Sequence, residues 1–226
     1  EKVVGSSRDD LIIAGASGSS HIAGGQGDDT IVGGADDVVD YGLEEVFGRH
    51  KPNYDASGIK ADLQNGKVID SYGDTDIIYR NESGVGIQNI VATSKDDIII
   101  GSDQDNVIKA GSGDDLIHTA AGDDEVFGGL GDDRIIVGAG NDTLYGDSRH
   151  EAGGRDTFVF EGGFGTDRIE DFEVAAARPV NYNLADTVWG PSLGGDRIIV
   201  RLDQDDRLEA PVAEPGKIVL RKTRQD

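Results

Sequence analysis

Aspartate recurs along this chain at a nine-residue spacing, and these carboxylates are the residues most able to do chemistry. A nine-residue frame such as Gly24 to Val32, GGQGDDTIV, fits twelve windows, and its sixth position is Asp in ten of them. The sixth positions are Asp10, Ser20, Asp29, Asp37, Asp97, Asn106, Asp115, Asp124, Asp133, Asp142, Asp156 and Asp167. Carboxylates and the exposed carbonyls of glycine-rich turns are the oxygen ligands that Ca²⁺ prefers. The pattern therefore indicates a series of calcium sites.

Each window also contains the parts that would position its carboxylate. The eighth position is apolar in all twelve windows, and the last three residues are rich in Ile and Val. This composition suits a short strand with one inward side chain. Glycine clusters at positions one, two and four, which suits a tight turn that can require positive φ. Because a single unit cannot bury its own core, the windows predict a stacked, all-β solenoid.

The acidic column would be unfavourable in such a stack without a cation. If two windows make one coil, the sixth-position carboxylates of successive coils lie about 4.8 Å apart. Two like charges at that distance repel by about 3 kcal/mol at an effective dielectric constant near 20. A divalent cation between them reverses the sign of this interaction. The alternative, a row of solvated surface aspartates, demands no fixed spacing and is disfavoured.

Three windows carry a family resemblance. GGQGDDTIV at Gly24, AGSGDDLIH at Ala110 and GGLGDDRII at Gly128 resemble the RTX nonapeptide GGxGxDxUx of type-I-secreted bacterial proteins. The resemblance implies a right-handed parallel β-roll, a form of β-solenoid, with several Ca²⁺ ions between stacked turns. It also implies that positions two, four and six of one turn, and positions one, three and six of the turn two windows later, hold each ion.

Carried over to this chain, the resemblance implies five regular sites. They join Ser6, Arg8 and Asp10 to Gly24, Gln26 and Asp29; Thr93, Lys95 and Asp97 to Ala110, Ser112 and Asp115; Ser102, Gln104 and Asn106 to Thr119, Ala121 and Asp124; Gly111, Gly113 and Asp115 to Gly128, Leu130 and Asp133; and Ala120, Gly122 and Asp124 to Val137, Ala139 and Asp142. Less regular sites would join Gly129, Gly131 and Asp133 to Asp156; Gly138, Gly140 and Asp142 to Asp167; and Ser20 to Asp37.

Departures from the pattern predict weaker binding at some turns. Arg8 and Lys95 replace glycine at position four, Asn106 keeps an oxygen but loses a charge, and Ser20 is a poor ligand. Five extra residues, 146–150, precede the window that starts at Glu151 and has Asp156 at its sixth position.

The windows divide the chain into four parts. Residues 1–40 form a first repeat block, 41–91 a non-repeat insert, 92–170 a second block and 171–226 a C-terminal capping region. Asn65-Gly66 between strand-like runs predicts a hairpin within a wider solenoid coil. The aromatic residues expected in the cap are Phe158, Phe160, Phe164, Phe172 and Trp189.

Composition limits the possible functions. The 226 residues include no Met or Cys and carry a formal net charge of −23, which argues against nucleic acid as a partner. No stretch is apolar enough to span a membrane, and no signal peptide is visible. The missing Met indicates a piece of a larger, secreted or cell-surface bacterial protein, whose other domains would be partners.

Three functions remain open at this stage. A non-enzymatic module with no catalytic residues, which folds on Ca²⁺ binding after export and so serves secretion and stability, explains the repeat best. The alternative is a polysaccharide- or surface-binding accessory module of an adhesin or alginate-modifying enzyme, for which the candidate contacts are Tyr54, Tyr79, Arg80, Tyr182 and Trp189. A calcium-dependent polysaccharide lyase is disfavoured, because that fold needs longer coils.

Overall fold

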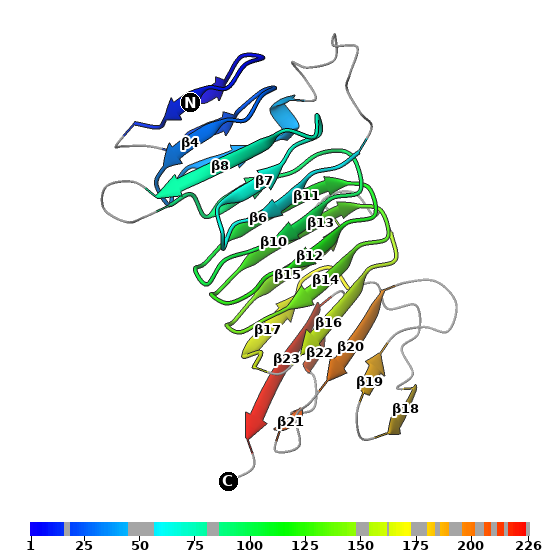
Figure 1. Ribbon diagram of the computed structural model, residues 1–226. Helices are drawn as coiled ribbons and strands as arrows, with labels where there is room; N and C mark the ends of the chain where they lie inside the picture. Colours follow the sequence, from blue (N-terminus) through cyan, green and yellow to red (C-terminus); the bar gives the residue numbers. More distant parts are fainter. Residues whose placement is uncertain are drawn as a thin grey trace.

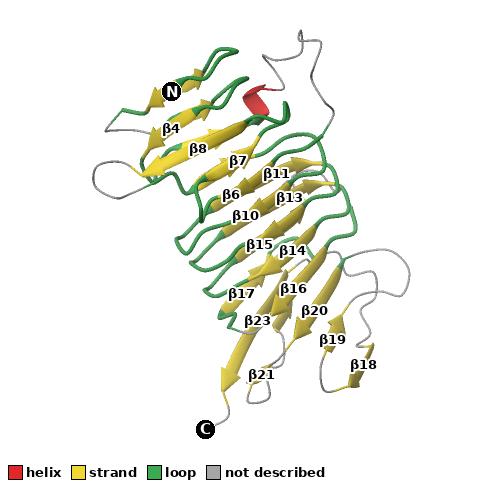
Figure 2. Cartoon of the chain, viewed as in Figure 1, coloured by secondary structure: helices red, strands yellow, loops and turns green. Residues whose placement is uncertain are grey.

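The chain winds into a roll of short strands (Figures 1 and 2). The computed structural model describes residues 1–15, 19–44, 57–80, 86–147, 154–161, 163–172, 180–183, 186–189, 196–201, 206–208, 212–214 and 217–224. Through the repeat blocks, successive strands alternate between two sheets, so the chain crosses the roll after each nonapeptide. Within the described residues, no helix combines the length and apolar character that crossing a membrane requires.

The middle of the roll shows the repeat most clearly. One sheet contains β11 (Val107–Ser112), β13 (Glu125–Leu130) and β15 (Thr143–Asp147); the other contains β10 (Ile98–Ile100), β12 (Leu116–His118) and β14 (Arg134–Val137). We name them the β11 sheet and the β12 sheet. Ile99 pairs with Ile117, and Ile117 with Ile135, in parallel register. Neighbouring strands are therefore 18 residues apart, one coil holds two nonapeptides, and the predicted all-β parallel roll is confirmed.

The core lies between the two sheets and is built from the eighth positions of the repeat. The eighth residues Ile99, Ile117 and Ile135 face inward from the β12 sheet, and Ile108 and Val126 face inward from the β11 sheet. All five are fully buried, while their strand neighbours are more exposed. Side chains alternate between the two faces of each short strand, so one apolar side chain per nonapeptide lies in the core. The sixth residue, two positions earlier, therefore lies at the turn that precedes the strand.

The first block continues both sheets toward the N-terminus. The β11 sheet gains β1 (Lys2–Val4), β3 (His21–Ala23), β5 (Val38–Asp40) and β9 (Asn89–Val91), and the β12 sheet gains β2 (Leu11–Ile13) and β4 (Thr30–Gly33). β5 pairs directly with β9, and β9 pairs with β11, in parallel. The β11 sheet therefore runs from one block into the other without an inserted strand.

The insert adds strands to the β12 sheet. These are β6 (Lys60–Asp62), β7 (Lys67–Ile69) and β8 (Thr75–Arg80). β6 pairs parallel with β10 and β8 pairs parallel with β4, while β7 lies antiparallel between them. The hairpin expected at Asn65-Gly66 joins β6 to β7, and Gly66 has φ of 63°. A regular roll would place one strand between β4 and β10, so the insert makes this sheet two strands longer.

The C-terminal residues pair with the last coils. β16 (Thr157–Glu161) and β17 (Thr166–Ile169) end the repeat. The later strands are β18 (Val180–Asn183), β19 (Asp186–Trp189), β20 (Arg197–Arg201), β21 (Asp206–Leu208), β22 (Val212–Glu214) and β23 (Lys217–Arg224). β20 adds parallel to β16, whereas β23 adds antiparallel to β17. Phe158 packs 6.4 Å from Phe172, and Phe160 packs 5.4 Å from Phe164, between ring centroids.

Candidate metal sites

The sixth-position side chains form one column along each sheet. In the middle of the β12 sheet, the backbone N–H of Asp97 donates to Oδ1 of Asp115 at 2.7 Å, and that of Asp115 donates to Oδ1 of Asp133 at 2.9 Å. In the β11 sheet, the N–H of Asp124 donates in the same way to Oδ1 of Asp142 at 2.9 Å. Each carboxylate is thereby tied to the turn one coil earlier, and the columns run along the roll.

The second oxygen of most column carboxylates is buried without a hydrogen-bond partner. This group of unpartnered Oδ2 atoms belongs to Asp29, Asp115, Asp124, Asp133, Asp142, Asp156 and Asp167. These residues are at most 2% exposed. A buried carboxylate oxygen without a donor is costly, because its lost hydration is not replaced. Each one marks a position where a positive charge or a proton would be stabilising.

The electrostatics of the columns agree with this geometry. Burial, together with the nearby charges of Asp133 and Asp97, raises the pKa of Asp115 to about 9. Burial likewise raises the pKa of Asp124 to about 8 and that of Asp167 to about 8. The folded roll therefore favours protonated or cation-bound carboxyl groups over free carboxylates.

The glycine positions of the repeat have two distinct causes. At positions two and four the backbone has positive φ, as at Gly111 (122°), Gly113 (114°), Gly129 (122°) and Gly131 (130°). At position one the constraint is steric, because a Cβ added to Gly128 would overlap Oδ2 of the carboxylate five residues later. The carboxylate oxygen thus packs directly against the turn that follows the preceding strand.

We distinguish two kinds of turn by the partners of the sixth-position side chain. The open turns leave Oδ2 of this side chain unpartnered, and their second residue, where described, is Gly or Ala. The open turns are residues 24–29, 110–115, 119–124, 128–133 and 137–142, together with the described parts 154–156 and 163–167 of the turns that end at Asp156 and Asp167. The closed turns of the nine-residue windows satisfy the sixth-position side chain from within the protein, and their second residue is Ser or Thr; the shortened window at Gly33, in which Gly34 donates to Asp37, is a separate case. The closed turns are residues 5–10, 92–97 and 101–106.

The turn 92–97 shows how closure works. Oδ2 of Asp97 accepts the backbone N–H of Thr93 at 2.8 Å, and the Thr93 hydroxyl lies 3.0 Å from both carboxylate oxygens. Oδ1 also accepts the N–H of Ile59 at 2.6 Å. Both carboxylate oxygens of Asp97 therefore already have donors from the protein.

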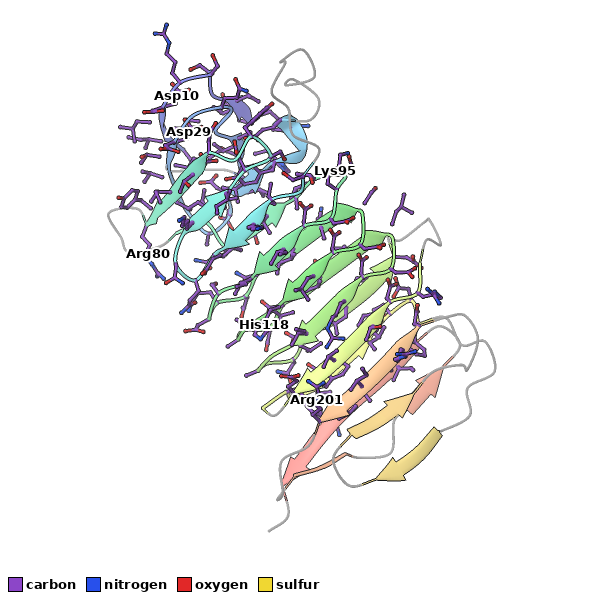
Figure 3. The ribbon with its side chains drawn as sticks, turned by 45° about the vertical axis from the view of Figure 1, so that its right-hand side comes forward. Asp10, Asp29, Arg80, Lys95, His118 and Arg201 are labelled. Carbon is purple, nitrogen blue, oxygen red and sulfur yellow. The ribbon has the colours of Figure 1, made fainter. Side chains whose placement is uncertain are left out.

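The other two closed turns repeat this arrangement. The N–H of Ser102 donates to Oδ1 of Asn106 at 2.7 Å, and the Asn106 amide donates to the carbonyl of Gln88 at 2.8 Å. The N–H of Ser6 donates to Oδ2 of Asp10 at 2.5 Å, and this hydrogen bond lowers the pKa of the exposed Asp10. Figure 3 shows Asp10 and Asp29 on neighbouring coils of the first block.

The remaining predicted ligands lie where the nonapeptide frame put them, with varied partners. The N–H of Ser20 donates to Oδ1 of Asp37 at 2.9 Å, and Oδ2 of Asp37 accepts the N–H of Gly34 at 2.8 Å. The ammonium of Lys95 contacts Ser94 within its own turn, and Arg8 is exposed. The turn residues of the other predicted sites stack in register, with carbonyl-to-amide bonds between coils such as Gly113 N–H to Leu130 O at 2.7 Å.

Two column members were missed by the nonapeptide frame. Oδ1 of Asp76 accepts the N–H of Asp29 at 3.1 Å, and Oδ1 of Asp196 accepts the N–H of Asp156 at 3.0 Å. Both are buried, and each has an isoleucine two residues later; Asp76 lies within β8, and Asp196 directly precedes β20. The short signal Asp-x-Ile, without its glycines, was the available clue.

A second carboxylate column at the fifth position was also missed. It runs in the opposite direction, because here the N–H of the later coil donates to the earlier side chain. The N–H of Asp114 donates to Oδ1 of Asp96 at 2.9 Å, and the N–H of Asp132 donates to Oδ1 of Asp114 at 2.8 Å. These side chains are exposed, so they clamp successive turns without creating unpartnered buried oxygens.

The fold and its buried carboxylate columns define a class, a parallel β-roll with stacked acidic turns. Comparison with protein families finds four copies of the RTX calcium-binding nonapeptide repeat, over residues 4–40, 84–117, 91–126 and 118–148. The chain therefore contains RTX calcium-binding repeats over these residues, as the three windows at Gly24, Ala110 and Gly128 indicated. A search of curated proteins found no significant match.

The described residues fit the calcium that this repeat family binds. The open turns offer oxygen donors in a site with paired, buried carboxylates, which suits a hard divalent cation. Among the described residues, no Lys, Arg or His forms an ion pair with Asp115, Asp124, Asp133 or Asp142. The module is thus calcium-binding in its repeat, and the open turns carry the atoms that calcium would satisfy.

Proposed function

We propose that this chain is a non-enzymatic module that folds when Ca²⁺ binds outside the cell, after export as part of a larger protein. The observation that carries the proposal is the row of buried, unpartnered carboxylate oxygens in the open turns. With a net charge of −23, the calcium-free chain would repel itself. Calcium then binds the folded roll and not the unfolded chain, so its binding free energy becomes folding free energy.

Within each site the residues of the chain have separate tasks. The glycines at positions two and four give the turn its shape, and the sixth-position Asp supplies the charge. The backbone N–H of the sixth residue in the preceding coil donates to Oδ1, so Oδ2 remains available to bind the ion. The fifth-position column keeps successive turns in register. The same architecture would support the stability of attached domains after secretion.

The direct test is circular dichroism of the whole chain in calcium and in EDTA. The β spectrum should form cooperatively at millimolar Ca²⁺ and disappear on chelation at neutral pH. A Mg²⁺ titration is the control, because Mg²⁺ keeps its waters and demands a smaller octahedral site. A β spectrum that persists unchanged in EDTA would contradict calcium-dependent folding.

A surface groove supports polysaccharide binding as a second candidate function. The rings of Phe127 and Tyr145 stack 4.7 Å apart on the outer face of the β11 sheet, and the Lys109 ammonium lies 5.8 Å from the Phe127 centroid. A cavity of 510 Å³ opens over Lys109, Phe127 and Glu125. Stacked aromatic faces beside a cation suit an acidic sugar chain. Of the contacts expected from sequence, Tyr79 is exposed on β8, Tyr54 lies outside the described residues, and the side chains of Tyr182 and Trp189 are likewise not described.

The two functions can be separated by one substitution. Phe127→Ala should abolish binding of an alginate oligomer in calorimetry while calcium-dependent folding remains. Tyr79→Ala, on the exposed end of β8, is the matched control. Equal alginate affinity in the wild type and in both variants would remove the groove from consideration.

A further inference from the structure

Three buried carboxylates converge beside the first block, and two of them lie outside the sixth-position columns. Glu44 lies in the helical residues 42–44 that follow β5 (red in Figure 2), Asp70 follows β7, and Asp76 is the second residue of β8. One ligand oxygen from each lies within 4.8 Å of the others. All three residues are at most 2% exposed.

Four of the six carboxylate oxygens in this cluster have donors, including Oδ1 of Asp76, which accepts the N–H of Asp29. The N–H of Gly25 donates to Oε1 of Glu44 at 3.1 Å, and the Tyr41 hydroxyl donates to Oδ2 of Asp76 at 2.9 Å. Oδ1 of Asp70 accepts the backbone N–H groups of residues 72 and 74, at 2.9 and 2.8 Å. These contacts orient the carboxylates, but they are neutral donors and leave the charge uncompensated.

The other oxygens are unpartnered. Oε2 of Glu44, Oδ2 of Asp70 and the hydroxyl of Ser71 are buried without a hydrogen bond. Among the described residues, no basic side chain forms an ion pair with the cluster. Three carboxylates therefore face one another in the interior with no cation from the protein. Burial raises the pKa of Glu44 to about 9, which agrees with a place that needs a proton or a metal ion.

The spacing of the cluster favours a metal ion. Ca²⁺ binds oxygens at about 2.3–2.6 Å, so two ligands on opposite sides of one ion lie up to about 5 Å apart. The three oxygens already lie within that limit. We propose that Glu44, Asp70 and Asp76 together bind one Ca²⁺ ion, at a site built from side chains of three non-repeating segments.

This site would have a different task from the columns. An ion in an open turn joins neighbouring coils of one sheet. In contrast, Glu44 follows a strand of the β11 sheet, while Asp70 follows β7 and Asp76 lies within β8, both of the β12 sheet. The ion would therefore tie the insert to both walls of the first block. The site does not depend on calcium in the open turns, so it extends the proposed function.

The experiment counts bound ions per chain by native mass spectrometry at saturating Ca²⁺. The test variant is Glu44→Gln with Asp70→Asn, which keeps size and hydrogen-bonding oxygens but removes two charges. Asp36→Asn, an exposed carboxylate of the same block, is the matched control. We expect the double variant to bind one ion fewer than the wild type, and the control to bind the same number. An unchanged ion count in the double variant would overturn the proposal.

Two further measurements keep the result interpretable. Circular dichroism at saturating Ca²⁺ checks that the double variant folds. If the double variant loses the β spectrum, the single variant Glu44→Gln is measured in its place. We expect this variant to bind one ion with several-fold weaker affinity, and an unchanged affinity would contradict the site. If the open turns bind no calcium, the wild type should hold a single ion that the double variant loses. Failure of the proposed function is thus distinguishable from failure of this site.

Discussion

The coil at 92–106 and the coils over 110–147 lie next to each other, share one hydrophobic core and treat their sixth-position side chains in opposite ways. In the first, the N–H and hydroxyl of Thr93 satisfy Asp97. In the second, Asp115 stacks on Asp97, and its Oδ2 has no partner. The two turns differ at positions two and four, where Thr93 and Lys95 correspond to Gly111 and Gly113, both of which have positive φ. Thr93 directs its N–H and its hydroxyl at Asp97, whereas Oδ2 of Asp115 has no donor. A side-chain donor can therefore take the place of a cation in this fold.

This comparison teaches that the roll is not uniformly dependent on calcium. The second block begins with a coil whose polar side chains are satisfied by the protein, and the coils that need an ion follow it. The closed coil can thus present a formed edge for the next turn before any ion binds. The family repeat alone would have treated all these turns alike.

The largest expected effect is on the pH dependence of folding stability in EDTA, which should differ in sign between the open turns and the closed turn at Asp10. An unfolded Asp titrates near about pH 4, whereas burial raises the pKa of Asp115 to about 9 and of Asp142 to about 6. A raised folded-state pKa stabilises the roll below about pH 4, and this stability is lost as pH rises through about 6 to 9. Asp10 has a lowered pKa, so its contribution has the opposite sign and is lost in acid.

Circular dichroism across pH 4 to 9, without calcium and at low protein concentration, checks this expectation. The β signal should be strongest near the acid end and should disappear toward pH 9. Saturating Ca²⁺ should remove most of that dependence, because the ion replaces the protons. A β signal that strengthens with rising pH in EDTA would contradict the role given to the open turns.

A smaller effect is expected from neutralising one pair of stacked open turns. Asp115→Asn with Asp133→Asn removes both charges that an ion between these turns would meet, and should raise the Ca²⁺ midpoint of folding about tenfold. This corresponds to about 1.4 kcal/mol. Asp114→Asn is the control, because its exposed Oδ1 acceptor is retained. Equal Ca²⁺ midpoints of folding for the double variant and the control would contradict the distinction between open and closed turns.

Opening a closed turn should have the next largest effect. Thr93→Gly removes the hydroxyl that donates to Asp97, which should cost about 1 kcal/mol in EDTA, because the backbone donors to Asp97 remain. In calcium the loss should be smaller, since Asp97 then resembles an open-turn carboxylate. Chemical denaturation in both conditions measures the difference, with Ser94→Gly as the neighbouring control. The same loss in EDTA and in calcium would show that the hydroxyl does not substitute for an ion.

The smallest effect concerns the fifth-position column. Asp114→Ala removes an exposed acceptor for the N–H of Asp132, which should lower stability by about 0.5–1.5 kcal/mol. The Ca²⁺ midpoint should barely change, because no buried oxygen is affected. Thermal unfolding at saturating calcium measures the loss. A large increase in the calcium requirement would instead make this column part of the ion sites.

The sequence predicted the coil period, the inward eighth position and the acidic columns, because each depends on a local pattern that repeats unbroken from Ala92. It did not predict Asp76 or Asp196 as column members, since their turns lack the glycines that mark the frame. It also treated Thr93 and Ser102 as ligands whose backbone oxygens would bind calcium. The folded turn adds that their N–H groups donate to the carboxylate or amide of the same turn, which the sequence did not indicate.

The cluster at Glu44, Asp70 and Asp76 shows a different limit. Its members are separated by up to 32 residues in sequence and belong to no repeat. Their convergence depends on the antiparallel β7 lying between β6 and β8, which brings Asp70 back beside Asp76. The boundaries proposed at residues 40, 91 and 170 remain predictions.

The hairpin of the insert gives the two walls of the roll unequal lengths. The β12 sheet has two more strands between the blocks than the β11 sheet, a surplus of about 10 Å at the usual strand spacing. Two walls joined at every coil cannot differ in length and stay straight, so the surplus must be taken up as curvature at β6, β7 and β8. The insert therefore introduces a bend in the axis of the roll, and this bend sets the direction of the second block relative to the first.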